Sequence, residues 1–160
     1  MEALEIVLRL RRATTDELSW FELEPHIAGY AAADGTIVLN PRSGLQEIER
    51  ACVVRNEAMR LLMAALSLSP DVDVTDAQAK AFAGTEYANN PVALRQTIVA
   101  RLASGDPSAG QGTELQIGYA RAVCALFEQV VQLECDEDAD RALVHLATNL
   151  RVRPRAQADG

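Results

Sequence analysis

One cluster of polar residues in this sequence has a spacing that could do chemistry. Asn56, Glu57 and Arg60 lie at positions i, i+1 and i+4 of a stretch expected to be helical, just after the strand-like segment IVLNP. A helix with a central glutamate after such a strand is the layout of metalloproteases that carry HExxH, where two histidines hold zinc and the glutamate is the general base. Asn56 and Arg60 occupy the histidine positions here, and neither replaces a zinc-bound imidazole. We therefore expect no metal and no zinc-peptidase chemistry.

These three residues can also be interpreted without a metal. On a solvated helix face, Glu57 and Arg60 would form only a weak i, i+3 ion pair. Alternatively, Asn56, Glu57 and Arg60 would hydrogen-bond a neighbouring hairpin or a partner chain. They are candidate interaction residues, and no residue is assigned a catalytic role. A degenerate zincin-like hydrolase that uses Glu57 with His26 is kept as a third alternative.

Arg55 interrupts the apolar face of the same stretch. That face is formed by Ile48, Cys52, Met59, Leu62 and Leu66. A buried guanidinium needs a carboxylate partner or solvent, and the long arginine stem can reach the surface from an apolar row. We expect Arg55 to extend to solvent, where it is a further interaction candidate.

The other residues capable of catalysis or metal binding form no motif. His26 and His145 have no serine or cysteine at a signature spacing and are expected to be structural. The three cysteines are odd in number and widely spaced, which predicts reduced thiols instead of a disulfide or zinc site. Acidic stretches at 71–76 and 136–140 lack the spacing of a calcium loop. No cofactor is expected.

Composition bounds the size of the fold and the class of partner. The chain has 160 residues, of which 49% are hydrophobic, enough for one core and too few for two. Its net charge of −8 repels phosphate backbones, so nucleic acid is not expected to bind the body of the protein. The same charge favours contact with a basic protein surface.

The C-terminal segment RVRPR is the exception to this acidity. It concentrates Arg151, Arg153 and Arg155 ahead of a polar end, and we treat 151–160 as a flexible Arg-rich tail. The arginines can bind phosphate or an acidic protein groove. They can equally form a solvated tail without a partner, and both readings stay open.

Local patterns predict mostly helices. The N-terminal run ALEIVLRLRRA alternates like a strand, but its good helix formers favour a helix. Strand-like residues on both sides of Ala33-Asp34-Gly35 predict a β-hairpin over about 27–39. Capping residues, prolines and glycines bound the other expected helices, at about 14–24, 44–67, 76–83, 90–104, 114–134 and 136–150.

These elements predict a mainly α protein, a single-domain helical bundle with one small hairpin. The domain would span 1–150, and the helices at 44–67, 90–104 and 114–134 would form its core. Met1 is followed by acidic residues instead of a basic and then apolar leader, so export by a signal peptide is not expected. No apolar run reaches the length of a membrane span.

A resemblance adds a possible origin. The string LNPRSGL and the following Glu49, Val53, Asn56-Glu57, Arg60 and Met63 resemble small uncharacterised proteins of tailed bacteriophages. FAGTEY and RLASGDPSA extend the resemblance over about residues 34–109. It implies a phage-encoded protein, either a virion or assembly component or an early protein acting on a host target. No catalytic residue is carried over by it.

The resulting functional expectation is a non-enzymatic phage structural or assembly protein. It would act through protein–protein contacts, with copies of itself or other virion proteins as partners. The alternative is an acidic inhibitor or modulator of a host enzyme. The expected location is the virion or the bacterial host cytoplasm.

Overall fold

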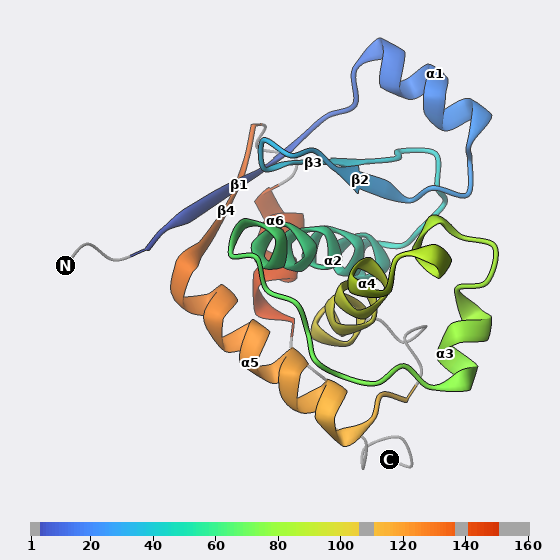
Figure 1. Ribbon diagram of the computed structural model, residues 1–160. Helices are drawn as coiled ribbons and strands as arrows, with labels where there is room; N and C mark the ends of the chain where they lie inside the picture. The colour runs from blue at the N-terminus through green and yellow to red at the C-terminus, as the bar shows by residue number, and fades with distance from the viewer. Residues whose placement is uncertain (1–3, 106–110, 137–140, 151–160) are drawn as a thin grey trace.

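The protein contains a four-stranded mixed sheet. A computed structural model describes residues 4–105, 111–136 and 141–150. The strands β1 (Ile6–Arg11), β2 (Gly29–Ala31), β3 (Thr36–Leu39) and β4 (Val131–Cys135) lie in the order β2-β3-β1-β4. β1 pairs in parallel with β3 and β4, whereas β2 is antiparallel to β3 and forms one edge (Figure 1). The fold is α/β, so the prediction of a helical bundle with one hairpin is wrong.

The N-terminal segment accounts for the largest part of that error, because it is strand β1 and not a helix. Leu8 and Leu10 are 3% and 2% exposed, while Val7, which precedes Leu8 in the strand, is 47% exposed. This alternation is the period of a half-buried strand. Pairing on both sides gives the segment ladder partners that outweigh its helix-forming residues.

The segment after the long C-terminal helix is also a strand. The helix expected over 114–134 ends at Val130, and β4 begins at Val131. The register Ile6↔Val131 and Leu8↔Leu133 aligns apolar residues across the strand pair. The hairpin predicted over 27–39 is present as β2 and β3, and Gly35 at its turn has a φ of +89°.

Most of the helices lie on one side of the sheet, and the helices supply most of the core. They are α1 (Thr15–Leu23), α2 (Glu47–Ala65), α3 (Asp76–Ala81), the 3₁₀ helix η1 (Glu86–Asn89), α4 (Pro91–Ala103), α5 (Glu114–Val130) and α6 (Arg141–Asn149). α2 runs under the sheet and contacts β1, β2 and β3, and α4, α5 and α6 pack around it (Figure 1). The last helix, expected from 136, is described from Arg141 onward. No helix in the described ranges is long and apolar enough to cross a membrane.

Arg55 lies at the centre of this helical layer and is fully buried, so the expectation that it reaches solvent is wrong. Its Nε donates to the carbonyl of Ala103 at 2.9 Å, and Nη1 donates to the carbonyls of Ala147 and Thr148 at 2.9 and 3.2 Å. These carbonyls lie at the C-terminal ends of α4 and α6, which carry unpaired acceptors and partial negative charge. The guanidinium also stacks on the Phe127 ring, with its carbon 4.9 Å from the ring centre. Backbone carbonyls at two helix ends thus stabilise its charge, in place of the carboxylate or solvent expected from the sequence.

The start of α1 is fixed by a partly buried ion pair. Arg11 Nη1 and Nη2 donate to the two carboxylate oxygens of Glu17 at 2.6 and 3.0 Å, and Glu17 also closes the capping box with Thr14. Hydrogen bonding from Arg11 lowers the pKa of Glu17 to about 2, against 4.5 for an ordinary glutamate. The stabilisation is complete above pH 4.5 and is lost as the pH falls towards 2.

We predict that Glu17→Gln lowers the unfolding free energy at pH 7 by about 1–2 kcal/mol, because charge-assisted bidentate bonds are lost. The deficit should shrink as the pH falls through the window in which wild-type Glu17 becomes protonated. Urea unfolding at a series of pH values measures it. Glu22→Gln is the matched control on the same helix, since the Glu22–Arg42 pair is exposed and should contribute under about 0.5 kcal/mol. A deficit that does not vary with pH would contradict the assignment.

Candidate binding cleft

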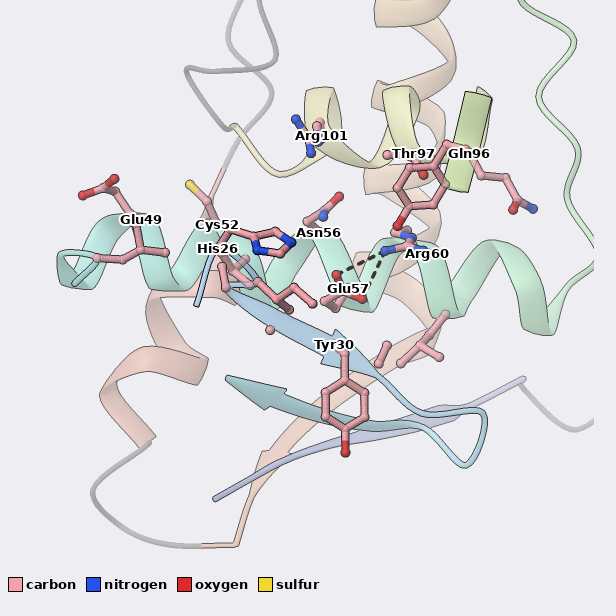
Figure 2. Close-up of a pocket in the computed structure, with 18 of the residues that line it drawn as sticks. His26, Tyr30, Glu49, Cys52, Asn56, Glu57, Arg60, Gln96, Thr97 and Arg101 are labelled. Atoms are coloured by element: carbon pink, nitrogen blue, oxygen red, sulfur yellow. Dashed lines mark hydrogen bonds and ion pairs between the residues drawn. The ribbon is translucent and has the colours of Figure 1, made fainter. Parts of the chain in front are cut away.

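A large open cleft runs between the edge strand β2 and the helices α2 and α4. Its volume is about 1810 Å³, larger than the roughly 300–1,000 Å³ of most small-ligand pockets. β2 lines one side through residues 28–31, α2 lines the floor, and η1 and α4 line the other side. Figure 2 shows Asn56, Glu57 and Arg60 on α2 facing this space. The three residues predicted as a cluster are therefore together in the cleft.

Glu57 is the most buried charge in the cleft. It is 6% exposed, and Arg60 Nη1 donates to its Oε1 and Oε2 at 3.2 and 3.4 Å. Burial raises the pKa of Glu57, and the positive charges of Arg60 and Arg101 offset this only in part. The interpretation as a solvated face is wrong, since such a face would leave the carboxylate hydrated, but the expected i, i+3 pair of Glu57 and Arg60 is present.

Two arginines flank an aromatic pair on the α4 side of the cleft. The rings of Phe82 and Tyr87 meet edge to face with centroids 6.1 Å apart. The guanidinium carbon of Arg60 lies 5.1 Å from the centre of the Tyr87 ring, and that of Arg101 lies 4.8 Å from the centre of the Phe82 ring. Stacking on a ring holds a guanidinium in place while leaving its edge free to donate hydrogen bonds. The cleft thus contains two positioned cations and one buried carboxylate.

Two buried polar atoms in the cleft lack a hydrogen-bond partner. They are Oδ1 of Asn56 on α2 and Oγ1 of Thr97 on α4, and both residues line the cleft. Thr97 is only 2% exposed. An unpaired buried polar atom costs free energy, on the order of 1–3 kcal/mol, so such atoms usually have a partner in a folded protein. The polar floor is therefore suited to a bound group that supplies the missing partners.

The outer edge of β2 offers backbone groups to the same cleft. Asn40 N–H donates to Ala28 O and Ala32 N–H donates to Thr36 O, both at 2.8 Å, so the even-numbered residues of this strand face β3. Because hydrogen bonding alternates along an antiparallel ladder, the N–H and C=O groups of Gly29 and Ala31 point away from β3. An extended chain could pair with them.

Packing requires a glycine in this strand. A Cβ on Gly29 would lie 2.8 Å from the carbonyl oxygen of Val38 and 3.2 Å from Cγ1 of Val53 on α2. The strand therefore lies close against α2, while Tyr30 points to the other side of the sheet (Figure 2), where it stacks edge to face with Trp20. The edge of β2 is thus held above the helix that carries Glu57.

Histidine and cysteine side chains in the cleft do not form a metal site. His26 is exposed and lies 3.5 Å from Glu24, and Cys52 is buried on α2. Across the described residues, no group of three His, Cys, Asp or Glu side chains is placed to hold a metal ion. The strand-then-helix layout of the HExxH peptidases is present, but Asn56 and Arg60 occupy the ligand positions.

The other predicted interaction residues lie elsewhere. Arg55 is in the core and contacts no cleft surface, while Arg151, Arg153 and Arg155 lie outside the described residues. Thr97 and Arg101 were not predicted as site residues, and they come from a separate helix. Their spacing of four residues on α4 places them on one face, but nothing in the sequence indicates that this face meets Glu57.

Comparisons with protein-family models, with curated proteins and with solved structures find no match to this chain.

We predict that Glu57→Gln stabilises the protein increasingly as the pH rises from the ordinary carboxyl range. The raised pKa means that the folded state holds the Glu57 proton more tightly than the unfolded state, so wild-type stability falls as the carboxylate ionises. Glutamine keeps the shape without that ionisation. Urea midpoints between about pH 4 and pH 8 test the sign, with the exposed Glu47→Gln on the same helix as control. A variant that loses stability relative to wild type as the pH rises would contradict it.

Proposed function

We propose that this chain is a non-catalytic protein-binding module that takes an extended segment of a partner protein into the cleft. The observation that carries the proposal is the free edge of β2 along one wall of the cleft, opposite α4. Addition of a strand to an exposed sheet edge is a common mode of peptide recognition, in which backbone hydrogen bonds give affinity and side-chain pockets give specificity. The cleft volume of about 1810 Å³ suits a chain segment.

Exposed apolar side chains support a peptide partner. Trp20 and Ile48 line the cleft and are 40% and 44% exposed. Trp20 lies on α1, and Ile48 lies near the start of α2, nine residues before Glu57, so an extended segment would meet apolar and polar surface in turn. Aromatic anchors beside satisfied polar contacts are the usual composition of a binding hot spot.

The chemistry of the floor supports binding over hydrolysis. Glu57, the residue that would act as a base, is paired with Arg60, and the two neighbouring ligand positions are an amide and a guanidinium. Its carboxylate is kept buried at a cost in stability, which is typical of functional sites. In a hydrolase alternative with Glu57 and His26, any activity would have to disappear in Glu57→Gln.

A displayed library of random seven-residue peptides, selected on the immobilised full-length chain, tests the binding proposal. Selected peptides should share an apolar residue and compete with one another for one site. Selection should fail on a chain in which Trp20→Ala and Ile48→Ser remove the apolar contacts. Leu115→Ser is the matched control, because Leu115 is 73% exposed and does not line the cleft. Failure to select any competing set on the wild-type chain would contradict the proposal.

The resemblance to proteins of tailed bacteriophages supports an assembly role for the module, with a virion protein or another copy as the partner. Mass spectrometry of purified particles of a phage that encodes the chain tests this role, and absence from the particles would contradict it. The net charge of −8 supports the second candidate, a modulator that docks on a basic surface of a host enzyme. Binding to one host enzyme with strong salt dependence would favour that candidate.

A further inference from the structure

From the polar floor of the cleft, we infer that the α4 end is a carboxylate subsite that binds one acidic side chain of the partner segment. The inference rests on the proposed function and specifies the chemistry of its ligand. Arg60 and Arg101 supply positive charge, while the Thr97 hydroxyl and the Asn56 carboxamide supply polar groups that now lack partners. Figure 2 shows these four side chains around the same part of the cleft, between α2 and α4.

The groups present match the hydrogen-bonding needs of a carboxylate. Such an anion accepts up to about four hydrogen bonds and pairs well with the planar edge of a guanidinium. Thr97 Oγ1 is itself buried, so rotation of the side chain, with the backbone in place, would turn its O–H towards the anion. A half-turn of the Asn56 carboxamide exchanges Oδ1 for Nδ2 and turns the unpaired acceptor into a second donor. Arg101, stacked on Phe82, presents its N–H groups from a fixed plane.

The charge balance favours a carboxylate over a phosphate dianion. Glu57 cancels one of the two arginine charges, which leaves a net charge of +1 at the floor. One monoanion neutralises that charge, whereas a dianion would leave a negative excess beside the buried Glu57 carboxylate. An anion bound here would also give Arg60 a charged partner besides Glu57, and Arg101 a charged partner besides the Phe82 ring.

The rest of the cleft confines an acidic side chain to this one place. The other charged residues that line it include Glu24, Glu49 and Glu86, and they would repel a carboxylate elsewhere. Among the described lining residues, the remaining basic group is His26, which already faces Glu24. An acidic residue in the partner would therefore fix the register of the segment along β2, because a strand pairing by itself allows slippage.

The peptide selection provides the first test. On the wild-type chain, the selected peptides should carry Asp or Glu at one fixed position relative to their apolar residue. Peptides selected on Arg101→Gln should keep the apolar residue but show no preference for Asp or Glu. Peptides selected on Arg101→Glu should carry Lys or Arg at the position where the wild-type chain selects Asp or Glu. Peptides that bind the cleft without any acidic position would overturn the inference while leaving the proposed function intact. Failure to select peptides at all would overturn both.

A selected peptide measures the size of the effect. Replacing its acidic residue with the matching amide should weaken binding to the wild-type chain by about 10- to 100-fold, and should change binding to Arg101→Gln by less than about 3-fold. Arg95→Gln, on the same helix but outside the cleft lining, is the matched control and should behave as wild type. Equal loss on both chains would show that the acidic residue contacts another part of the protein.

Thr97→Val separates binding from folding. Valine has the shape of threonine without the unpaired hydroxyl, so the thermal midpoint of the variant should equal or exceed that of the wild type. Its affinity for the acidic peptide should nevertheless fall by roughly 5- to 20-fold.

Acetate, titrated into the labelled full-length chain, gives a readout without peptide. It should shift the Thr97 amide and Arg101 side-chain resonances saturably, more strongly than inorganic phosphate does, and in Thr97→Val the Arg101 shifts should need roughly 5- to 20-fold more acetate. Unsaturable shifts, or a stronger response to phosphate, would overturn the carboxylate assignment.

Discussion

Replacing Arg55 with methionine is expected to lower the unfolding free energy by about 3–5 kcal/mol, the largest effect of any substitution considered. Methionine fills most of the volume but leaves the carbonyls of Ala103 and Ala147 without the donors that now reach them at 2.9 Å. Since these carbonyls end α4 and α6, both helices lose their tie to α2. Urea unfolding followed by circular dichroism measures the loss.

Arg55→Lys is the informative companion variant. An ammonium keeps the charge but cannot reach the ends of both helices in one plane, so we expect it to recover less than half of the lost stability. Arg50→Lys, also on α2 and only partly buried, is the matched control and should stay within about 0.5 kcal/mol of wild type. If Arg55→Met unfolds at the wild-type urea concentration, the two-helix role of Arg55 is wrong.

Ala31→Pro is expected to weaken binding of the partner segment strongly, with little effect on the fold. The Ala31 N–H points away from β3, so proline removes a group that pairs with the ligand and not a bond of the sheet. Loss of one backbone bond and the steric effect of the ring should weaken a selected peptide by at least about 10- to 100-fold. Titration calorimetry of wild type and variant with the same peptide measures this.

A neighbouring position provides the control for backbone geometry. Ala32 N–H donates to Thr36 O within the hairpin, so Ala32→Pro should destabilise the protein, which Ala31→Pro should not. Thermal melts of the two variants separate the outward and inward amides of the strand. Unchanged peptide affinity in a folded Ala31→Pro variant would contradict strand addition at β2.

The turns and helix ends that were predicted correctly are those determined by a few neighbouring residues. The hairpin turn with Gly35, the Asn90 cap with Pro91, and the capping box of Thr113 with Gln116 are all present. The sheet was not predicted, because β1 obtains its pairing from β3 and β4, and β4 is more than 120 positions away from it. A segment with both a strand period and good helix formers is decided by such distant partners.

The candidate site was predicted only in part, because some of its residues come from elements far apart in the sequence. Asn56, Glu57 and Arg60 share one helix, so their spacing alone placed them together. Their burial, and the presence of Tyr87, Thr97 and Arg101 in the same cleft, depend on how α4 and η1 pack against α2, which no local pattern encodes. The prediction that Arg55 reaches solvent was wrong for a related reason. Its apolar neighbours correctly indicated a buried row, but the acceptors that stabilise its charge are backbone carbonyls of two other helices, which have no sequence signature.

Strand addition requires that a partner segment pairs with the free edge of β2. Amide hydrogen exchange of the full-length chain, with and without a selected peptide, tests it at the level of single residues. The Gly29 and Ala31 amides should exchange quickly in the free protein and become protected in the complex, while the Tyr30 amide, which faces β3, should change little. Unchanged exchange at Gly29 and Ala31 with the peptide fully bound would contradict the claim.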